Sequence, residues 1–175
     1  MVFLETKIPG VFEIQVEPKA DDRGFFARSW CREECQLKGL NPDVVQCNIS
    51  FNLRKGTLRG MHYQAAPWGE AKLVRCTRGS IYDVAVDLRP DSVAFKQWVA
   101  VVLSAADRNM IYIPENCGHG FLTLEDETEV FYQMSQLYNP ESARGVRLDD
   151  PAFQIAWPGD VEVISERDAT YPNFE

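Results

Sequence analysis

The feature that most constrains the fold of this chain is a succession of short strand patterns separated by turn signals. Short apolar or alternating runs recur between clusters of Gly, Pro, Asn and Asp. Only one clear helix is predicted, at residues 31–38, with a second short helix near 151–153. The pattern predicts an all-β sandwich or barrel, of which the jelly roll is one form. The predicted strands cover residues 11–17, 25–30, 44–53, 57–64, 71–77, 81–88, 98–103, 109–113, 120–124 and 129–137.

The turn sequences predict which of these strands are neighbours. A tight turn at residues 78–80 predicts a hairpin between the strands before and after it. The acidic turn at 125–127 predicts a second hairpin in the same way. The strands at 98–103 and 109–113 are expected to continue the meander between these two hairpins.

Length and charge limit the class of protein. The 175 residues are expected to form a single domain, 1–175, large enough to bury a core without a metal or a disulfide. A formal net charge of −8 argues against a general affinity for nucleic acid or an anionic membrane. It does not exclude an anionic ligand, because a few local Arg and Lys side chains can hold one phosphate group.

The cysteines indicate the compartment. Their count is five, an odd number, and the sequence shows no signal-peptide pattern and no long apolar run. We therefore expect a reduced, cytoplasmic protein. Cys31 and Cys35 have the spacing of a two-thiol metal clip, but no further ligand is near them in the sequence. Half-buried positions on the predicted helix are the better interpretation.

The two histidines are the first candidates for chemistry, since His is the side chain that exchanges protons near neutral pH. His62 lies in Leu-Arg-Gly-Met-His-Tyr-Gln, and His119 lies in Pro-Glu-Asn-Cys-Gly-His-Gly-Phe. Residues three apart on a strand point to opposite faces, so a bend at Gly60 is needed to bring Arg59 and His62 to one cleft. The alternative is that both histidines are buried and hydrogen-bonded to the backbone.

Three further side chains carry a functional and a structural interpretation each. Lys72 stands at the start of an apolar strand, either as a site residue or as an edge lysine that blunts strand pairing. Tyr132 in an apolar strand is either a core tyrosine or a proton donor, since its hydroxyl is protonated at pH 7. Asp168 on the polar tail is either a surface carboxylate or, beside a histidine, the group that fixes its tautomer.

Metal binding is not expected. Metal-binding barrels of the cupin type present a His-x-His pair, and here Gln64 occupies the second position. A site built from His62, His119 and carboxylates is the alternative that remains. The sequence contains no serine nucleophile motif, Walker loop or Rossmann glycine pattern.

Ordered sequence blocks along almost the whole chain carry a family resemblance. They include Asp-Arg-Gly-Phe-Phe from Asp22, Gln-Cys-Asn from Gln46, Leu-Arg-Gly-Met-His from Leu58, Lys-Leu-Val-Arg-Cys from Lys72, Tyr-Asp-Val-Ala-Val-Asp-Leu-Arg from Tyr82, Gly-His-Gly-Phe from Gly118, Tyr132, Tyr138 with Pro140, and Trp157-Pro158. The chain resembles the dTDP-4-dehydrorhamnose 3,5-epimerases. The resemblance implies a jelly-roll, cupin-like fold with a few short helices.

The resemblance also implies a reaction. The substrate would be a nucleoside-diphosphate 4-keto-6-deoxyhexose, whose ketone acidifies the protons on C3 and C5. His62 would be the base and Asp168 would orient it, while Lys72, assisted by His119, would stabilise the enolate oxygen. Tyr132 would return a proton from the opposite face of the sugar. No cofactor would be needed, because the ketone itself accepts the electrons.

Binding roles follow from the same resemblance. Arg59 would hold the diphosphate together with Arg23, which would reach in from the partner of a homodimer with exchanged N-terminal strands. Gln46 and Asn48 would line the nucleotide side, and Tyr138 would stack near the base. The other expected substrate-binding residues are Phe26, Ser50 and Arg167.

The chain departs from the family pattern at positions expected on the substrate side. Arg28 and Ala143 replace acidic residues, Cys47 replaces Asp, Ile49 replaces His, and Arg167 replaces Lys in the tail. We expect the reaction class to be kept while the sugar or nucleotide differs. The alternatives are a single-centre epimerase, at C3 or C5, on a CDP- or GDP-linked sugar, a ketoisomerase, and a non-catalytic sugar-nucleotide-binding cupin.

Overall fold

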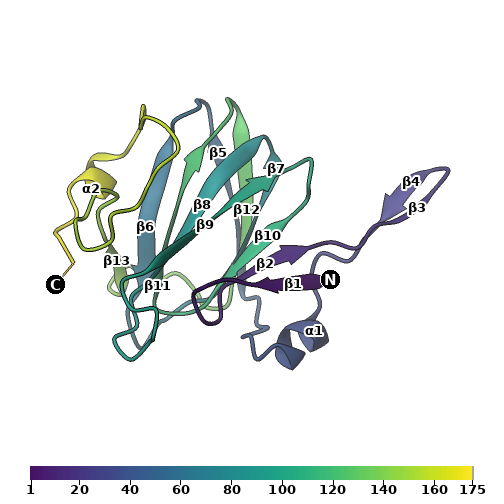
Figure 1. Cartoon of the computed structure of the whole chain (residues 1–175), viewed down its shortest axis with the longest axis horizontal. Helices are drawn as coiled ribbons and strands as arrows, with labels where there is room; N and C mark the ends of the chain where they lie inside the picture. Colours follow the sequence, from purple (N-terminus) through teal and green to yellow (C-terminus); the bar gives the residue numbers. More distant parts are fainter. Residues whose placement is uncertain (175) are drawn as a thin grey trace.

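Two antiparallel sheets pack face to face in the computed structural model, which describes residues 1–174 (Figure 1). In spatial order, the first sheet contains β1 (Val2–Glu5), β2 (Phe12–Gln15), β10 (Met110–Ile113), β7 (Lys72–Arg78), β12 (Thr128–Met134) and β5 (Gln46–Asn52). The second contains β13 (Ala143–Gly145), β6 (Leu58–Gln64), β11 (Cys117–Thr123), β8 (Ser80–Asp87) and β9 (Trp98–Ser104). The predicted all-β sandwich is confirmed.

The predicted hairpins and meander are wrong. β7 and β8, β9 and β10, and β11 and β12 are consecutive in sequence, yet the members of each pair lie in different sheets. The turn at Gly79 is tight, with a positive φ of 72°, but it carries the chain from one layer to the other. A turn sequence indicates only that the chain reverses direction, and not whether the next strand lies in the same sheet or in the facing one. Crossing to the facing sheet is what lets the apolar sides of both strands meet in one core.

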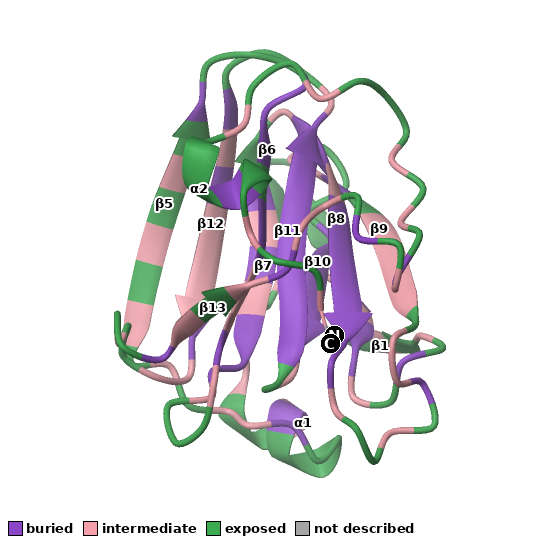
Figure 2. Cartoon of the chain, turned by 90° about the vertical axis from the view of Figure 1, so that its left-hand side faces the viewer, coloured by how far each residue is buried: buried purple, intermediate pink, exposed green. Residues whose placement is uncertain are grey.

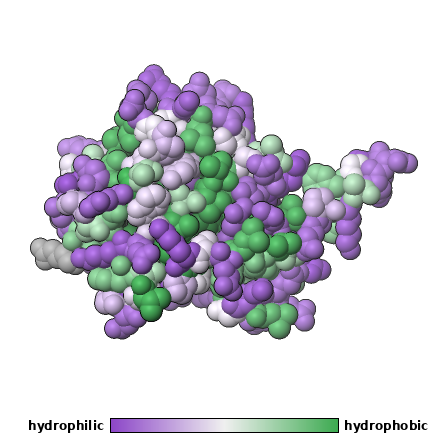
Figure 3. Space-filling view, in the orientation of Figure 1, coloured by the Kyte–Doolittle hydropathy of each residue, from purple (hydrophilic) through white to green (hydrophobic). Residues whose placement is uncertain are grey.

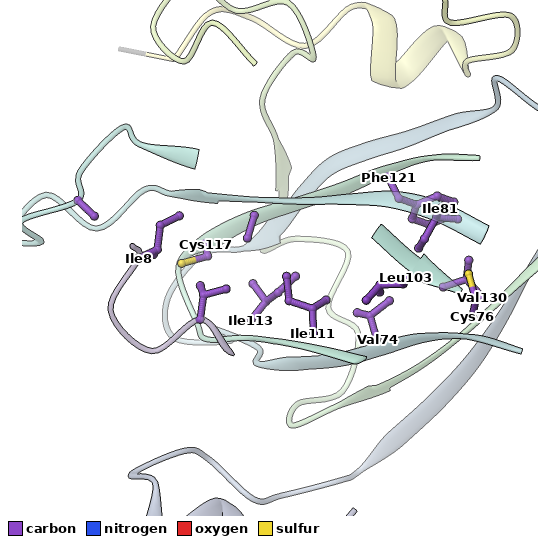
Figure 4. Packing of buried hydrophobic residues seen from close by; sticks show 13 residues of the cluster. Ile8, Val74, Cys76, Ile81, Leu103, Ile111, Ile113, Cys117, Phe121 and Val130 are labelled. Carbon is purple, nitrogen blue, oxygen red and sulfur yellow. The ribbon is translucent and has the colours of Figure 1, made fainter. Parts of the chain in front are cut away.

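The core fills the space between the sheets. Thirteen buried residues form its main cluster, and Figure 4 shows ten of them labelled between the two layers. Val74 and Val130 come from the first sheet, while Ile81 and Phe121 come from the second. Figure 2 shows β8 and β11 buried along their length, whereas β5, an edge strand, alternates between partly buried and exposed residues. Three residues of this strand, Ile49, Ser50 and Phe51, line the cavity at this edge.

A small hairpin projects from the body. β3 (Lys19–Asp21) and β4 (Gly24–Phe26) form it, and Figures 1 and 3 show it standing away from the sandwich. All of its residues are exposed, and Phe26 is 74% exposed. The predicted strand at 25–30 thus ends early, at Phe26.

The helices differ from expectation in the C-terminal part. α1 (Arg32–Leu37) confirms the predicted early helix. Residues 151–153 form a turn instead of a helix, and the second helix is α2 (Glu166–Ala169). Neither helix of the described residues is long or apolar enough to cross a membrane. All five cysteines lie in the described part of the chain and are free thiols.

Candidate active site

A cavity of about 630 Å³ opens at the β5 edge of the sandwich. Strands β5, β12 and β7 supply one wall and β6 and β11 supply the other. Strand β13 and residues 163–168, which include the start of α2, close the cavity on a third side. Residues that are more than one hundred positions apart in the sequence therefore share this space.

A bulge in β6 places two of the predicted residues on the same wall. His62 is opposite His119 and Arg59 is opposite Phe121, so β6 has one residue more than β11 over this stretch. The extra residue cancels the odd spacing of Arg59 and His62, and both side chains line the cavity. Gly60 is required at the bulge: its φ is +132°, and a Cβ there would collide with the backbone of β11. The predicted bend at Gly60 is confirmed.

His62 is held by Asp168. Its Nε2 lies 2.7 Å from Oδ1 of Asp168, and the backbone N–H of Gly60 donates to Oδ2 at 3.3 Å. Ser165 caps α2 by accepting from the backbone N–H of Asp168, which fixes the carboxylate toward the cavity. The side chain of Asp168 is only 7% exposed, while that of His62 is 41% exposed.

The electrostatics assign the tautomer of His62. Burial alone would raise the pKa of Asp168, but hydrogen bonding with His62 and Gly60 holds it below its ordinary value. Asp168 is therefore ionised at neutral pH and only accepts hydrogen bonds. Nε2 of His62 must carry the proton, so Nδ1 keeps the lone pair that a base needs.

Lys72 lies on a central strand, which makes the edge-lysine interpretation wrong. β7 pairs with β10 on one side and β12 on the other. The ammonium of Lys72 is buried; it lies 2.9 Å from Oε1 of Glu70 and donates to the carbonyl of His62 at 3.2 Å. A buried ammonium beside an open cavity can stabilise an anionic oxygen, because the low-dielectric surroundings strengthen the attraction.

Tyr132 faces His62 across the cavity. It lies on β12 of the first sheet, whereas His62 lies on β6 of the second, and both line the cavity. Burial and the negative charge of Glu70 raise the pKa of Tyr132, against a smaller opposing effect of Arg59. The phenol is therefore protonated at neutral pH and suited to donate a proton.

His119 forms a second pair with a carboxylate. Its Nε2 lies 2.9 Å from Oδ2 of Asp83, which is fully buried on β8. Burial raises the pKa of Asp83, and the nearby His119 and Lys72 oppose that rise. His119 lines the cavity, but its side chain is only 9% exposed, compared with 41% for His62.

Nine of the thirteen predicted site residues line the cavity. They are Ser50, Arg59, His62, Lys72, His119, Tyr132, Tyr138, Arg167 and Asp168. Gln46 and Asn48 do not line it, and their amides pack against Sδ of Met134, at 3.7 Å and 3.1 Å. Arg23 and Phe26 lie on the projecting hairpin, outside the cavity of their own chain.

Several residues of the cavity or its support were not predicted. Glu70 and Tyr171 belong to this group: Glu70 lines the cavity, and the ring of Tyr171 stacks edge-on against His62 at 6.1 Å between centroids. Asp83 and Ser165 are the supports described above. Two of these carried a usable signal, since Glu70 is two residues before Lys72, and Ser-x-x-Asp is a helix N-cap pattern.

The departures from the family pattern lie in different surroundings. Ala143 and Ile49 line the cavity, and Ile49 is 64% exposed. Cys47 is exposed and does not line the cavity, and Arg28 forms a salt bridge with Glu34 at 2.6 Å. Among residues 1–174 there is no group of three or more His, Cys, Asp or Glu side chains arranged to hold a metal ion.

Comparison with known proteins decides the family. The family model described as dTDP-4-dehydrorhamnose 3,5-epimerase matches residues 5–175. The chain belongs to this family. A relative of that name from Shigella flexneri is 38% identical over 175 residues, covering 99% of this chain and 96% of its own. The predicted family and enzyme class, a carbohydrate epimerase among the isomerases, are confirmed.

Solved structures agree in fold over nearly the whole chain. The crystal structure of dTDP-4-dehydrorhamnose 3,5-epimerase from Bacillus anthracis, with TDP and PPi bound, has a TM-score of 0.94 and 35% identity, and covers 99% of both chains. ChmJ, a 3′-monoepimerase from Streptomyces bikiniensis solved with dTDP-quinovose, has a TM-score of 0.86 and 33% identity. It covers 96% of this chain and 85% of its own. The jelly-roll fold is confirmed.

Proposed function

We propose that this epimerase inverts C3, C5 or both in a nucleoside-diphosphate 4-keto-6-deoxyhexose, without a cofactor. The observation that carries the proposal is the placement of His62 and Tyr132 on facing walls of one cavity, with Lys72 between the sheets beside them. Inversion needs a base and an acid on opposite faces of the sugar ring. The TDP and dTDP-quinovose in the two solved relatives support a nucleotide-sugar substrate.

The first step is removal of a proton from the carbon next to the ketone. Nδ1 of His62 takes the proton, the C–H electrons form a C=C bond, and the carbonyl π electrons move to the oxygen. The resulting enolate oxygen is stabilised by the Lys72 ammonium, an interaction worth roughly 3–4 kcal/mol by comparison with single oxyanion-hole donors. Asp168 balances the charge of the imidazolium that forms.

The second step returns a proton from the other face. The Tyr132 hydroxyl donates to the carbon as the enolate electrons return, and the ketone is restored with inverted configuration. The phenolate then regains a proton and His62 loses one to solvent. Each turnover therefore replaces a carbon-bound hydrogen by one from water. In D₂O, the inverted carbons acquire deuterium.

The diphosphate is assigned to arginines from two subunits. Arg59 lines the cavity, and its Nε donates to Asn52 at 2.7 Å, which fixes the guanidinium. Arg23 lies on the projecting hairpin with an 89% exposed side chain, in reach of another molecule and not of its own cavity. We propose a homodimer with exchanged N-terminal strands, in which each hairpin completes the partner's site.

A mixed-dimer experiment tests this exchange. Arg23→Ala and His62→Ala are each expected to abolish most activity as homodimers. Coexpression of the two variants would create dimers with one intact site, and statistical pairing predicts recovery of about a quarter of wild-type activity. No recovery in verified mixed dimers would place Arg23 and His62 of the same chain in one site, and would contradict the exchange.

Proton NMR in D₂O tests the reaction itself. The substrate is dTDP-4-keto-6-deoxyglucose, followed by its CDP- and GDP-linked forms. Deuterium at C3 and C5 is expected for a double epimerase, and deuterium at one carbon for a single-centre enzyme. Absence of deuterium and of any new sugar with all three nucleotides would refute the proposed function, and a shifted ketone would identify a ketoisomerase.

The single-centre enzyme is kept as a second candidate because of two observations. The chain is similar to a 3′-monoepimerase over 96% of its length, and Ala143 lines the cavity where the family pattern has an acidic residue. The remaining parts of the proposal are a cytoplasmic location, which the five free thiols support, and a single domain spanning 1–175. Residue 175 lies outside the described residues.

A further inference from the structure

A carboxylate in the cavity has no role in the mechanism derived above. Glu70 precedes β7 and lines the cavity, with only 6% of its side chain exposed. Oε1 is paired with the Lys72 ammonium at 2.9 Å. Oε2 is buried and has no hydrogen-bond partner in the part of the chain that the structure describes. One half of a buried anion is thus unsatisfied beside the group that would hold the enolate.

An unpaired buried carboxylate oxygen is costly, and proteins rarely keep one without a reason. An ionised carboxylate is only an acceptor, so the partner of Oε2 must be a donor. The Lys72 ammonium already donates to Oε1 and to the carbonyl of His62. The proposed function gives the third N–H of Lys72 to the enolate oxygen, so the donor for Oε2 is best supplied by a ligand that enters the cavity.

We propose that Oε2 of Glu70 accepts a hydrogen bond from the hydroxyl on C3 of the sugar. The inference rests on the proposed function, in which the Lys72 ammonium holds the C4 oxygen. C4 is flanked by C3, which bears a hydroxyl, and by C5, which bears a methyl group. The C3 hydroxyl is thus the only donor adjacent to the oxygen on Lys72, and the Glu70 carboxylate is adjacent to Lys72 on the protein side.

This contact makes Glu70 a residue that determines specificity. It selects sugars with a hydrogen-bond donor beside the ketone, because a sugar lacking it would leave the buried oxygen unpaired. A hydrogen bond to a charged group predicts discrimination of about 10- to 150-fold in kcat/KM. Glu70→Gln would reduce this preference, because the sugar hydroxyl would then hydrogen-bond to a neutral amide instead of a charged carboxylate, and such a bond is weaker.

A thermodynamic cycle tests the contact. Wild type and Glu70→Gln are each assayed with the dTDP-linked 4-keto-6-deoxy sugar and with its 3-deoxy analogue, by deuterium uptake at the carbons flanking the ketone. Uptake at these carbons does not itself require the C3 hydroxyl, so both sugars report. Wild type is expected to prefer the hydroxylated sugar by about 10- to 150-fold, and the variant, with a neutral hydrogen bond, by only about 2- to 10-fold.

Equal discrimination by wild type and Glu70→Gln would overturn the proposal, because the two changes would then act independently. Glu70→Asp retains the charge beside Lys72 but shortens the side chain, and it too is expected to lose the preference. Glu129→Gln, a carboxylate on β12 outside the cavity, is the matched control and should discriminate as wild type does. If wild type took up no deuterium from either sugar, the proposed function would fail, and this inference with it.

Discussion

Replacing Asp168 by Asn isolates the part that the carboxylate plays in proton transfer. The substitution preserves size and keeps an acceptor for the backbone N–H of Gly60. It removes the charge opposite Nε2 of His62 and can present an N–H₂ donor at that place, 2.7 Å from the ring nitrogen. The imidazole would then be favoured in the tautomer with its proton on Nδ1, the nitrogen that acts as the base in the proposed mechanism.

The expected loss has a lower and an upper estimate. The hydrogen bond from His62 to an ionised acceptor is worth about 1.5–3 kcal/mol, or roughly 10- to 150-fold in rate, if only the orientation of the ring is affected. A wrong tautomer costs more: the same Asp→Asn change in a Ser-His-Asp triad lowers kcat by about 10⁴. Because His62 is 41% exposed, water can partly replace Asp168 as an acceptor. We therefore expect a loss of about 10² to 10³.

Initial rates of deuterium uptake, followed by proton NMR at saturating substrate, provide the assay. KM is expected to change little, since the side chain of Asp168 is only 7% exposed and contacts His62, the proposed base. Asp91→Asn, an exposed carboxylate in the loop after β8, is the matched control for removal of one negative charge. Its rate should equal that of wild type.

Retention of more than about one fifth of the wild-type rate by the folded Asp168→Asn enzyme would refute this reasoning. It would mean that neither the charge nor the tautomer of His62 limits proton abstraction. A large loss that appears in KM alone would instead assign Asp168 to substrate binding, which also contradicts the role derived from the geometry.

Three further predictions concern the proposed proton donor Tyr132, the bulge at Gly60, and the stability of the protein at low pH. Tyr132→Phe should retain deuterium uptake at one carbon while epimerisation falls by about 10²- to 10⁴-fold; equal loss of both, seen by NMR, would indicate a structural role. Gly60→Ala should yield little folded protein by circular dichroism, because its Cβ would collide with β11, and a normal melting curve would contradict this. Burial alone would raise the pKa of Asp87, but hydrogen bonds from Arg89 and Ser92 hold it below its ordinary value. The contribution of the ionised Asp87 to stability is therefore complete above the unfolded-state pKa of about 4, and it is lost as pH falls through the lower folded-state pKa. Asp87→Asn should reduce the urea-derived free energy of unfolding at pH 7 and reduce it much less near pH 2.

Local patterns in the sequence predicted where most strands are, because alternation and turn residues act within a few positions. They did not predict which strands pair. The turn at Gly79 reads as a hairpin in sequence, yet it joins strands of opposite sheets. Pairing depends on which faces must be buried together, and that is a property of the whole sandwich.

The site shows the same division at the level of single residues. His62, Lys72 and Tyr132 were candidates from their residue types and neighbours, and the structure places all three in one cavity. The partner of His62 is 106 residues away, and no spacing in the chain indicates that α2 returns to β6. The position of Glu70 two residues before Lys72 suggests a place in the same cavity, but only the structure reveals that one of its oxygens has no hydrogen-bond partner among the described residues.

By itself, the sequence determined the fold class, the family and the kinds of side chain available for proton transfer. These depend on residue identity and local order, which a chain carries before it folds. The tertiary structure alone decided that a one-residue bulge turns Arg59 and His62 to the same wall, and that His62 and Tyr132 line one cavity from opposite sheets. Such relations arise from packing between distant segments, and local sequence does not encode them.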